Sequence, residues 1–160
     1  MESKFNFKNF SIVIPIYNEE EILEESTNAI FSLCKRIEID FEIIFSENGS
    51  TDKTKAIAEE LTNKHPEIKI ISNPEPNYGN ALKTGFKIAK NDLVVSFDID
   101  YYSESFLSEA LKLESEYSGI TASKRLGSSE DGRRFIRRLA TNFFVILLKT
   151  LFGTKLSDTH

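Results

Sequence analysis

The chain has 160 residues, of which 40% are hydrophobic and 28% are charged, a size and composition typical of one globular domain. A single cysteine excludes a disulfide framework and a cysteine zinc site within the chain, and two histidines far apart in sequence argue against a histidine metal site. Residues 1–9 have no apolar signal-peptide core, and no stretch of eighteen residues is free of charge, so we expect neither a signal peptide nor a transmembrane helix. We predict that residues 1–160 form a single domain.

The net charge of −5 is unevenly distributed. Residues 1–123 hold twelve Lys/Arg and twenty-two Asp/Glu, whereas residues 124–160 hold eight and three, so the two parts carry −10 and +5. A basic C-terminal quarter on an acidic body indicates an anionic partner for that quarter. A solvated helix face would carry the same charges, and this alternative stays open.

Apolar runs rich in Ile, Val and Phe alternate with helical patterns along the chain. The predicted strands are residues 10–15, 41–46, 68–72, 93–97 and 119–123. The predicted helices are residues 19–37, 52–64, 78–90, 103–116 and 133–152. Strands that are apolar throughout are typical of a parallel sheet covered on both faces, and their alternation with helices indicates right-handed βαβ units. The sequence therefore predicts an α/β fold, a doubly wound and mostly parallel sheet with helices on both faces.

Polar residues follow each of the first four predicted strands. In chain order, the clusters are Tyr17-Asn18-Glu19, Glu47-Asn48-Gly49-Ser50, Asn77-Tyr78-Gly79 and Asp98-Ile99-Asp100. The carboxyl ends of parallel strands share one edge of the sheet, and ligands of such sheets bind at that edge. The four clusters therefore predict one site.

The last of these clusters predicts a metal site. Asp98 and Asp100 end the apolar run 92–97, and both carboxylates can turn toward one point if the strand geometry breaks there. Mg²⁺ and Mn²⁺ take oxygen ligands of this kind, with substrate phosphates completing the shell. We therefore expect Asp98 and Asp100 to bind Mg²⁺ or Mn²⁺ in an enzyme that handles a nucleotide-diphosphate compound. In a chain with 25 acidic residues, an Asp-x-Asp pair also arises by chance.

The turn after the first strand could form a nucleoside pocket. Pro15 stiffens the strand exit, Tyr17 offers a flat face and a hydroxyl, and Glu19 could accept hydrogen bonds from ribose hydroxyls. The alternative is plain helix capping by Asn18 or Glu19.

The next two clusters complete this interpretation. A carboxylate at Glu47 could accept the imino N–H of a uracil or guanine base, although the segment is also typical of a turn. Gly79 lets the backbone approach a ligand closely. The chain lacks the glycine patterns of a P-loop and of a dinucleotide fold, which leaves phosphate neutralisation to the metal.

A basic and apolar segment stands near the C-terminus. Arg133, Arg134, Arg137 and Arg138 precede the apolar run 143–148. A helix of this composition can lie in a membrane interface with its arginines on anionic headgroups. A core helix with solvated arginines fits the same pattern.

Taken together, these motifs resemble the family 2 glycosyltransferases of the GT-A fold along the whole chain. The resemblance is carried, in order, by residues 11–20 (SIVIPIYNEE), 46–54 (SENGSTDKT), 77–85 (NYGNALKTG) and 98–100 (DID). Residues 123–125 (SKR), 137–142 (RRLATN) and 155–159 (KLSDT) are similar to the dolichol/polyprenyl-phosphate mannose or glucose synthase group.

The resemblance implies an enzyme that transfers a hexose, with inversion, from a UDP- or GDP-linked sugar to a polyprenyl or dolichyl phosphate or a glycan. It implies cytoplasmic action at the cytosolic face of a membrane, which residues 133–152 would contact, and no nucleic-acid partner. Expected nucleotide-sugar-binding residues are Pro15, Tyr17, Glu19, Phe45, Glu47, Asn48, Gly79, Ile99 and Lys124. Expected catalytic residues are Asp98 and Asp100, which would hold the metal, and Asp158, the late carboxylate that could serve as a base for a hydroxyl acceptor.

The chain departs from the family pattern at three positions. Glu47-Asn48 replaces an Asp pair, Tyr102 replaces a metal-binding Gln, and Lys124 replaces an Arg. The family also continues beyond the residues that match Asp158, so we expect the chain to be truncated at its C-terminal end. The sequence does not name the sugar, the nucleotide, the acceptor or the oligomeric state.

Two alternatives remain at this point. One is a nucleotide-sugar-binding module or inactive fragment that docks on a membrane partner. The other is a sugar-1-phosphate nucleotidyltransferase, although such enzymes carry a Gly-rich, Arg-containing loop after the first strand where this chain has Tyr17-Asn18-Glu19.

Overall fold

The computed structural model describes residues 7–113. The chain divides into two units, Met1–Ser118 and Gly119–His160, and all described residues lie in the first. The predictions for residues 119–123 and 133–152, and for Lys124 and Asp158, fall outside the described residues. The single-domain interpretation of residues 1–160 stays a prediction.

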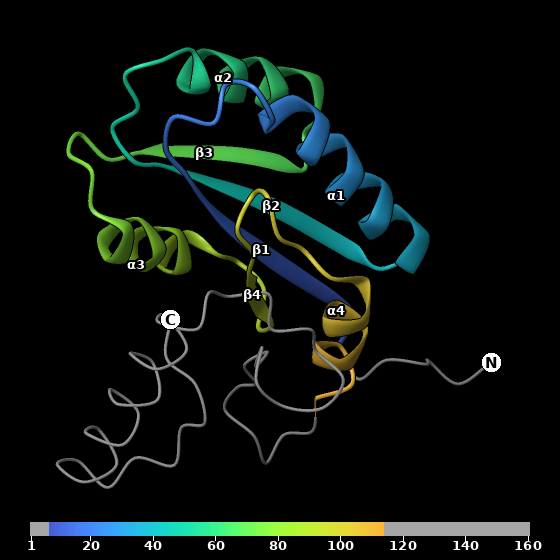
Figure 1. Ribbon diagram of the computed structural model, residues 1–160. Helices are drawn as coiled ribbons and strands as arrows, with labels where there is room; N and C mark the ends of the chain where they lie inside the picture. Colours follow the sequence, from blue (N-terminus) through green and yellow to red (C-terminus); the bar gives the residue numbers. More distant parts are fainter. Residues whose placement is uncertain (1–6, 114–160) are drawn as a thin grey trace, which may run out of the picture. The chain divides into compact units, whose positions relative to one another are not determined.

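Strands and helices alternate through the described residues (Figure 1). The elements are β1 (Asn9–Ile16), α1 (Leu23–Ile37), β2 (Asp40–Glu47), α2 (Thr54–Lys64), β3 (Ile68–Ser72), α3 (Tyr78–Ile88), β4 (Val94–Ser96) and α4 (Glu104–Ala110). The strands form one parallel sheet in the order β3-β2-β1-β4. The predicted α/β fold is confirmed, and the four strand predictions within residues 7–113 are each within one residue of the observed bounds at either end.

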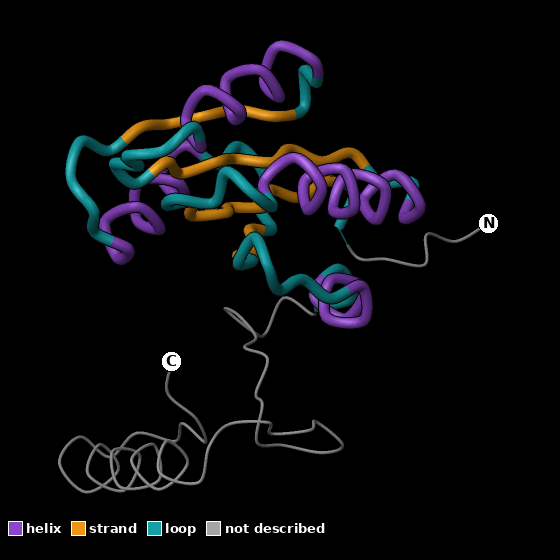
Figure 2. The backbone as a smooth tube through the Cα atoms, turned by 45° about the horizontal axis from the view of Figure 1, so that its top comes forward, coloured by secondary structure: helices purple, strands orange, loops and turns teal. Residues whose placement is uncertain are grey.

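The chain reverses its direction across the sheet after β3. It first moves outward from β1 through β2 to β3, and then crosses back to place β4 on the other side of β1. Because crossovers are right-handed, α1 and α2 cover one face and α3 covers the other, as Figures 1 and 2 show. The point of reversal therefore lies between β1 and β4.

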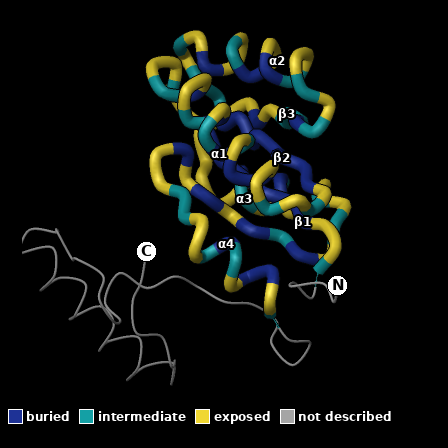
Figure 3. The backbone as a smooth tube through the Cα atoms, turned by 90° about the vertical axis from the view of Figure 1, so that its right-hand side faces the viewer, coloured by how far each residue is buried: buried dark blue, intermediate teal, exposed yellow. Residues whose placement is uncertain are grey.

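The core explains why the strands are apolar throughout. In both β1 and β2 only the first residue is exposed and the other seven are buried (Figure 3). Alternate residues of β1, from Phe10 to Ile16, join a core cluster with Leu23 and Ile30 of α1 and Leu107 of α4. The two strands pair along their full length, from Asn9 with Asp40 to Ile16 with Glu47. The loops that follow them therefore start side by side.

The starts of α1 and α2 differ from the sequence-based prediction, whereas α3 starts at Tyr78 as predicted. α1 begins at Leu23 and not at residue 19. Asn18 has a left-handed backbone with φ of 55°, and residues 20–22 form a turn in which the backbone N–H of Ile22 donates to the carbonyl of Glu19 at 3.1 Å. Its N-cap position is Ile22, which makes no capping side-chain bond, so the alternative role of Asn18 or Glu19 as the cap of α1 is wrong. α2 begins at Thr54 and not at residue 52. Within residues 7–113, no helix is long and apolar enough to cross a membrane.

Candidate functional site

A hollow of about 240 Å³ opens at the carboxyl edge of the sheet, at the point of reversal between β1 and β4. It is lined by Pro15, Ile16, Tyr17, Glu19, Asn48, Tyr78, Asp98, Ile99 and Asp100. Seven of these residues were expected from the sequence to bind a nucleotide-sugar or a metal. They come from three separate segments of the chain, and parallel pairing of the strands brings them to one edge.

Three predicted residues do not line this hollow. Phe45 has no exposed surface and lies in the core cluster. Glu47 is 2% exposed, and its Oε1 accepts a hydrogen bond from the backbone N–H of Ser50 at 2.5 Å. Gly79 lies in the first turn of α3. Direct contact of these three residues with a ligand stays a prediction.

The Asp98–Asp100 segment is a turn and not a continued strand. β4 ends at Ser96, and the backbone N–H of Tyr101 donates to the carbonyl of Asp98 at 3.1 Å. Ile99 is buried at 2% exposure, whereas both aspartates are exposed and line the hollow. The strand geometry therefore breaks where the sequence indicated.

The hollow has an acidic wall. Burial raises the pKa of Glu19, and the negative charges of Asp100, Asp52 and Asp98 raise it further. Within residues 7–113, no group of three or more His, Cys, Asp or Glu side chains is arranged to hold a metal ion. Metal binding by Asp98 and Asp100, with phosphate oxygens as the remaining ligands, stays a prediction.

Several polar residues of the motifs connect the two rim loops, residues 17–20 and 50–54. Asn18 Oδ1 accepts from the backbone N–H of Thr51 at 2.9 Å. Thr54 Oγ1 accepts from the backbone N–H of Glu19 at 2.7 Å, and Asp52 Oδ2 accepts from that of Glu20 at 3.2 Å. The side chains of Asn18, Asp52 and Thr54 therefore bind the neighbouring rim loop, and these bonds fix the loop that carries Tyr17 and Glu19.

Sequence reasoning gave no role to Asn73 and named Tyr78 only as a member of the cluster Asn77-Tyr78-Gly79. Asn73 is 6% exposed, and its Nδ2 donates to the carbonyl of Glu47 at 3.1 Å, which ties the end of β2 to the loop after β3. Tyr78 lines the hollow, and its hydroxyl donates to Asp98 Oδ1 at 3.0 Å. Their positions after predicted strands and at a helix start were the available signal.

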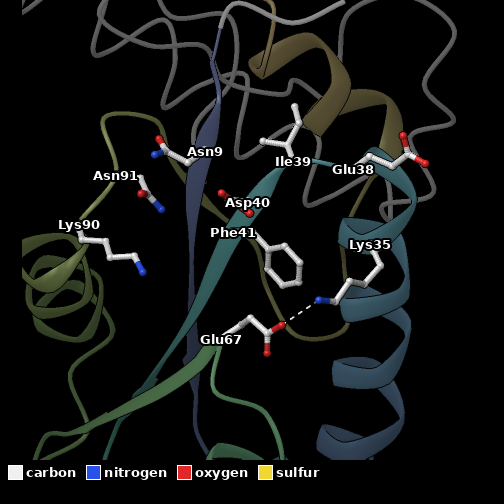
Figure 4. Close-up of a pocket in the computed structure, with 9 residues that line it drawn as sticks. All are labelled: Asn9, Lys35, Glu38, Ile39, Asp40, Phe41, Glu67, Lys90 and Asn91. Carbon is white, nitrogen blue, oxygen red and sulfur yellow. Dashed lines mark hydrogen bonds and ion pairs between the residues drawn. The ribbon is translucent and has the colours of Figure 1, made fainter. Parts of the chain in front are cut away.

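A larger hollow of about 460 Å³ lies at the amino edge of the sheet (Figure 4). Phe41 forms part of its wall, and Lys35 and Glu67 form an ion pair of 2.8 Å on one side. None of the residues predicted to bind a ligand lines it. Since ligands of open parallel sheets bind at the carboxyl edge, the smaller hollow is the candidate site.

Comparison with known protein families assigns the chain to one of them. Residues 11–158 match the model of the family described as Glycosyl transferase family 2. The chain belongs to this family of glycosyltransferases.

Among curated relatives, an undecaprenyl-phosphate 4-deoxy-4-formamido-L-arabinose transferase of Pseudomonas fluorescens (strain Pf0-1) is 30% identical over 152 residues, which are 92% of this chain and 44% of the relative. The protein of the same name from Proteus mirabilis (strain HI4320) is 37% identical over 92 residues, 56% of this chain and 28% of the relative. The chain thus spans less than half the length of these relatives.

Solved structures of glycosyltransferases share the fold. The mannosyltransferase PcManGT from Pyrobaculum calidifontis, in complex with GDP-Man and Mn²⁺, matches 64% of this chain and 31% of its own with a TM-score of 0.54 and 24% identity. S. aureus TarS in complex with UDP-GlcNAc matches 64% of this chain and 30% of its own with a TM-score of 0.52 and 26% identity. The GT-A character of the fold, expected from the sequence, is confirmed.

Proposed function

We propose that this chain binds a nucleotide-sugar donor and transfers its sugar to a polyprenyl-phosphate acceptor. The observation that carries the proposal is the position of the candidate hollow. It lies at the carboxyl edge where the sheet order reverses, and open α/β sheets bind their ligands at such a point. Family membership supports the reaction type, and the lining of the hollow supports the choice of residues.

In this proposal the loop after β1 holds the nucleoside. Tyr17 is 42% exposed on the wall of the hollow and offers its ring to the base. Glu19 accepts from ribose hydroxyls. Asn48 Oδ1 already accepts from the backbone N–H of Asn77 at 2.7 Å, which leaves the Asn48 amide nitrogen to donate to a base carbonyl. Uracil, guanine and cytosine carry such a carbonyl and adenine does not, so this contact disfavours an ADP-sugar. The UDP- or GDP-sugar of the proposal follows from the family resemblance.

Asp98 and Asp100 would hold Mg²⁺ or Mn²⁺ on the diphosphate. Both carboxylates line the hollow. Burial is the main cause of the raised pKa of Glu19, and the negative charges of Asp100 and Asp98, which a cation would offset, add to it. PcManGT, a structural neighbour, is in complex with Mn²⁺. When bound, a divalent cation supplies Lewis-acid assistance to the departing nucleoside diphosphate.

The transfer proceeds with inversion in this proposal. An acceptor oxygen forms a bond to the anomeric carbon while the bond from that carbon to the diphosphate oxygen breaks on the opposite face. The bonding electron pair leaves with the nucleoside diphosphate. A phosphate acceptor is already ionised at neutral pH and needs no general base, and Lys124 would meet phosphate. A hydroxyl acceptor would instead give its proton to Asp158.

The acceptor is proposed from the relatives. Those from P. fluorescens and P. mirabilis carry names that specify undecaprenyl phosphate. A lipid phosphate is reached at a membrane surface, and residues 133–152 would contact anionic headgroups at the cytosolic face. Cosedimentation with anionic vesicles, and its loss when the four arginines of residues 133–138 are changed to Gln, tests this part separately.

Calorimetric titration of UDP and of GDP, each with and without Mn²⁺, tests the donor site. We expect one nucleotide to bind, and Mn²⁺ to strengthen its binding. Asp98→Asn and Asp100→Asn should each remove most of the effect of Mn²⁺, because each loses a charged ligand of the cation. Asp92→Asn is the matched control, since Asp92 is exposed just before β4, at the other end of that strand.

The outcomes separate the proposal from its rivals. Metal-dependent binding followed by transfer to undecaprenyl phosphate supports the proposal. Binding without transfer favours a nucleotide-sugar-binding module. Full transfer activity in the Asp98→Asn/Asp100→Asn double variant would contradict the assigned role of the two aspartates.

A further inference from the structure

The hydroxyl of Tyr78 reaches a predicted metal ligand from a distant part of the chain. It donates to Asp98 Oδ1 at 3.0 Å across twenty residues of sequence. Tyr78 belongs to the first turn of α3, whereas Asp98 follows β4, so the bond joins two elements on either side of the hollow. Both side chains line that hollow.

The backbone of Tyr78 is held on both sides. Before it, the side chain of Asn77 caps α3 by accepting from the backbone N–H of Asn80 at 2.9 Å. The backbone N–H of Asn77 in turn donates to Asn48 Oδ1, at the end of β2. After it, Ala81 is fully buried and anchors the helix on the sheet. The ring of Tyr78 therefore projects from a fixed point although the residue is 55% exposed.

The chemistry of the contact suits a neutral donor. A tyrosine hydroxyl is protonated at neutral pH, and here it donates its hydrogen to Asp98 Oδ1. The hydroxyl engages one oxygen of Asp98, and a carboxylate has a second oxygen that can meet a cation. Carboxylates that bind metals are commonly oriented by such a hydrogen bond from a neighbouring group.

We propose that Tyr78 is a positioning residue, whose hydroxyl orients the Asp98 carboxylate toward the divalent cation of the nucleotide diphosphate. The inference rests on the proposed function, because it assumes that Asp98 is a metal ligand. Tyr78 acts through Asp98 and need not touch the sugar. The contact also explains how Asp98, an exposed residue on a turn, can keep a defined orientation.

The test compares Tyr78→Phe with the unchanged 160-residue protein. The measured quantities are the affinity for Mn²⁺ in the presence of UDP or GDP, the affinity for the same nucleotide without metal, and the urea midpoint. We expect Tyr78→Phe to weaken Mn²⁺ binding by about 10-fold, at the low end of what loss of an orienting hydrogen bond costs. The metal-free nucleotide affinity and the urea midpoint should stay unchanged, because the ring remains and the residue is largely exposed.

Tyr101→Phe is the matched control. Tyr101 is 56% exposed in the turn that carries the aspartates, and it does not line the hollow. This variant should keep the Mn²⁺ affinity of the unchanged protein.

Unchanged Mn²⁺ binding by Tyr78→Phe would overturn the inference. Tighter Mn²⁺ binding would overturn it as well, because it would show that the hydroxyl competes with the metal for Asp98. Equal losses of metal-free and metal-dependent nucleotide binding would also overturn it, because they indicate direct nucleotide contact. If the unchanged protein shows no metal-dependent nucleotide binding, the proposed function itself fails, and this result is distinct from a failure at Tyr78 alone.

Discussion

Glu42 is a carboxylate with 1% exposure in the middle of an apolar sheet. Its Oε1 accepts from Ser11 Oγ at 2.6 Å and from the backbone N–H of Lys90 at 2.9 Å, and its Oε2 lies 2.8 Å from Lys69 Nζ. Burial alone would raise the pKa of Glu42, but the hydrogen bonds from Lys69, Ser11 and Lys90 outweigh it and hold that pKa below 4.5. The charged side chain therefore joins β1, β2, β3 and the loop before β4.

Glu42→Gln should destabilise the protein at neutral pH. The folded pKa of Glu42 is lower than its unfolded pKa, so its contribution is present above pH 4.5 and is lost as pH falls through the folded pKa. We expect the variant to lose about 2–3 kcal/mol of unfolding free energy at pH 7, since an ion pair with a buried member is broken. Urea unfolding at neutral and acidic pH measures this, and the difference should shrink in acid.

Glu67→Gln is the control for Glu42→Gln, because it breaks the Lys35–Glu67 ion pair at a more exposed position. Exposed ion pairs contribute little, so this variant should lose less than about 1 kcal/mol. Equal losses in the two variants, or a pH-independent loss in Glu42→Gln, would contradict the role given to the Glu42 charge.

At the scale of elements, the contact of α3 with β1 depends on a glycine. A Cβ atom at Gly85 would lie 2.4 Å from Val13 Cγ1, well inside van der Waals contact. Glycine in a helix interior costs about 1 kcal/mol relative to alanine. The close approach of α3 to the sheet explains why the chain accepts that cost at this position.

Gly85→Ala should therefore lower the unfolding free energy, by about 1–3 kcal/mol, although alanine is the better helix former. Urea unfolding measures the loss. Gly79→Ala is the matched control in the same helix. A Cβ atom there would meet only Asn77 Oδ1 at 3.7 Å, so this variant should not lower the unfolding free energy. In a Val13→Ala background the cost of Gly85→Ala should shrink, and an unchanged cost would contradict the steric explanation.

The strands and helices could be predicted from the sequence where the pattern that marks them lies within the element and its flanking residues. The β3 strand was predicted with its observed bounds because its apolar run is closed by turn residues on both sides. The start of α1 was not predicted correctly. The loop before α1 contains the left-handed Asn18, whose side chain accepts a hydrogen bond from Thr51 of another loop, and the local sequence does not show this contact. Asp98 was identified from its own segment, whereas its bond to Tyr78 joins residues that only the fold brings together. Contacts of that kind leave no periodic pattern.

At the scale of the whole molecule, residues 7–113 contain the sheet, its core and the candidate hollow. The predicted Lys124 and Asp158 fall in the second unit, Gly119–His160. The first unit therefore holds the residues proposed to bind the nucleoside and the metal, but neither Lys124, which is proposed to meet phosphate, nor Asp158, which is proposed as a base.

A chain that ends at Ser118 should fold and bind the nucleotide with Mn²⁺, but should not transfer sugar. We expect one cooperative urea transition, because the buried parts of β1 and β2 and the helices on both faces are all retained. Calorimetry with UDP and GDP measures binding, and a transfer assay measures activity. A chain that shows no cooperative transition would instead support the interpretation of residues 1–160 as one inseparable domain.

The bonds between the rim loops also limit how the donor preference of this chain could be changed. Asn18 and Glu20 exchange hydrogen bonds with residues 50–53 in both directions, since each loop donates backbone N–H groups to side chains of the other. A transplant of either loop alone from a relative would leave donors and acceptors of the remaining loop unmatched. The two segments should therefore covary among relatives, and a graft that alters nucleotide selectivity should succeed only when both are exchanged as a pair.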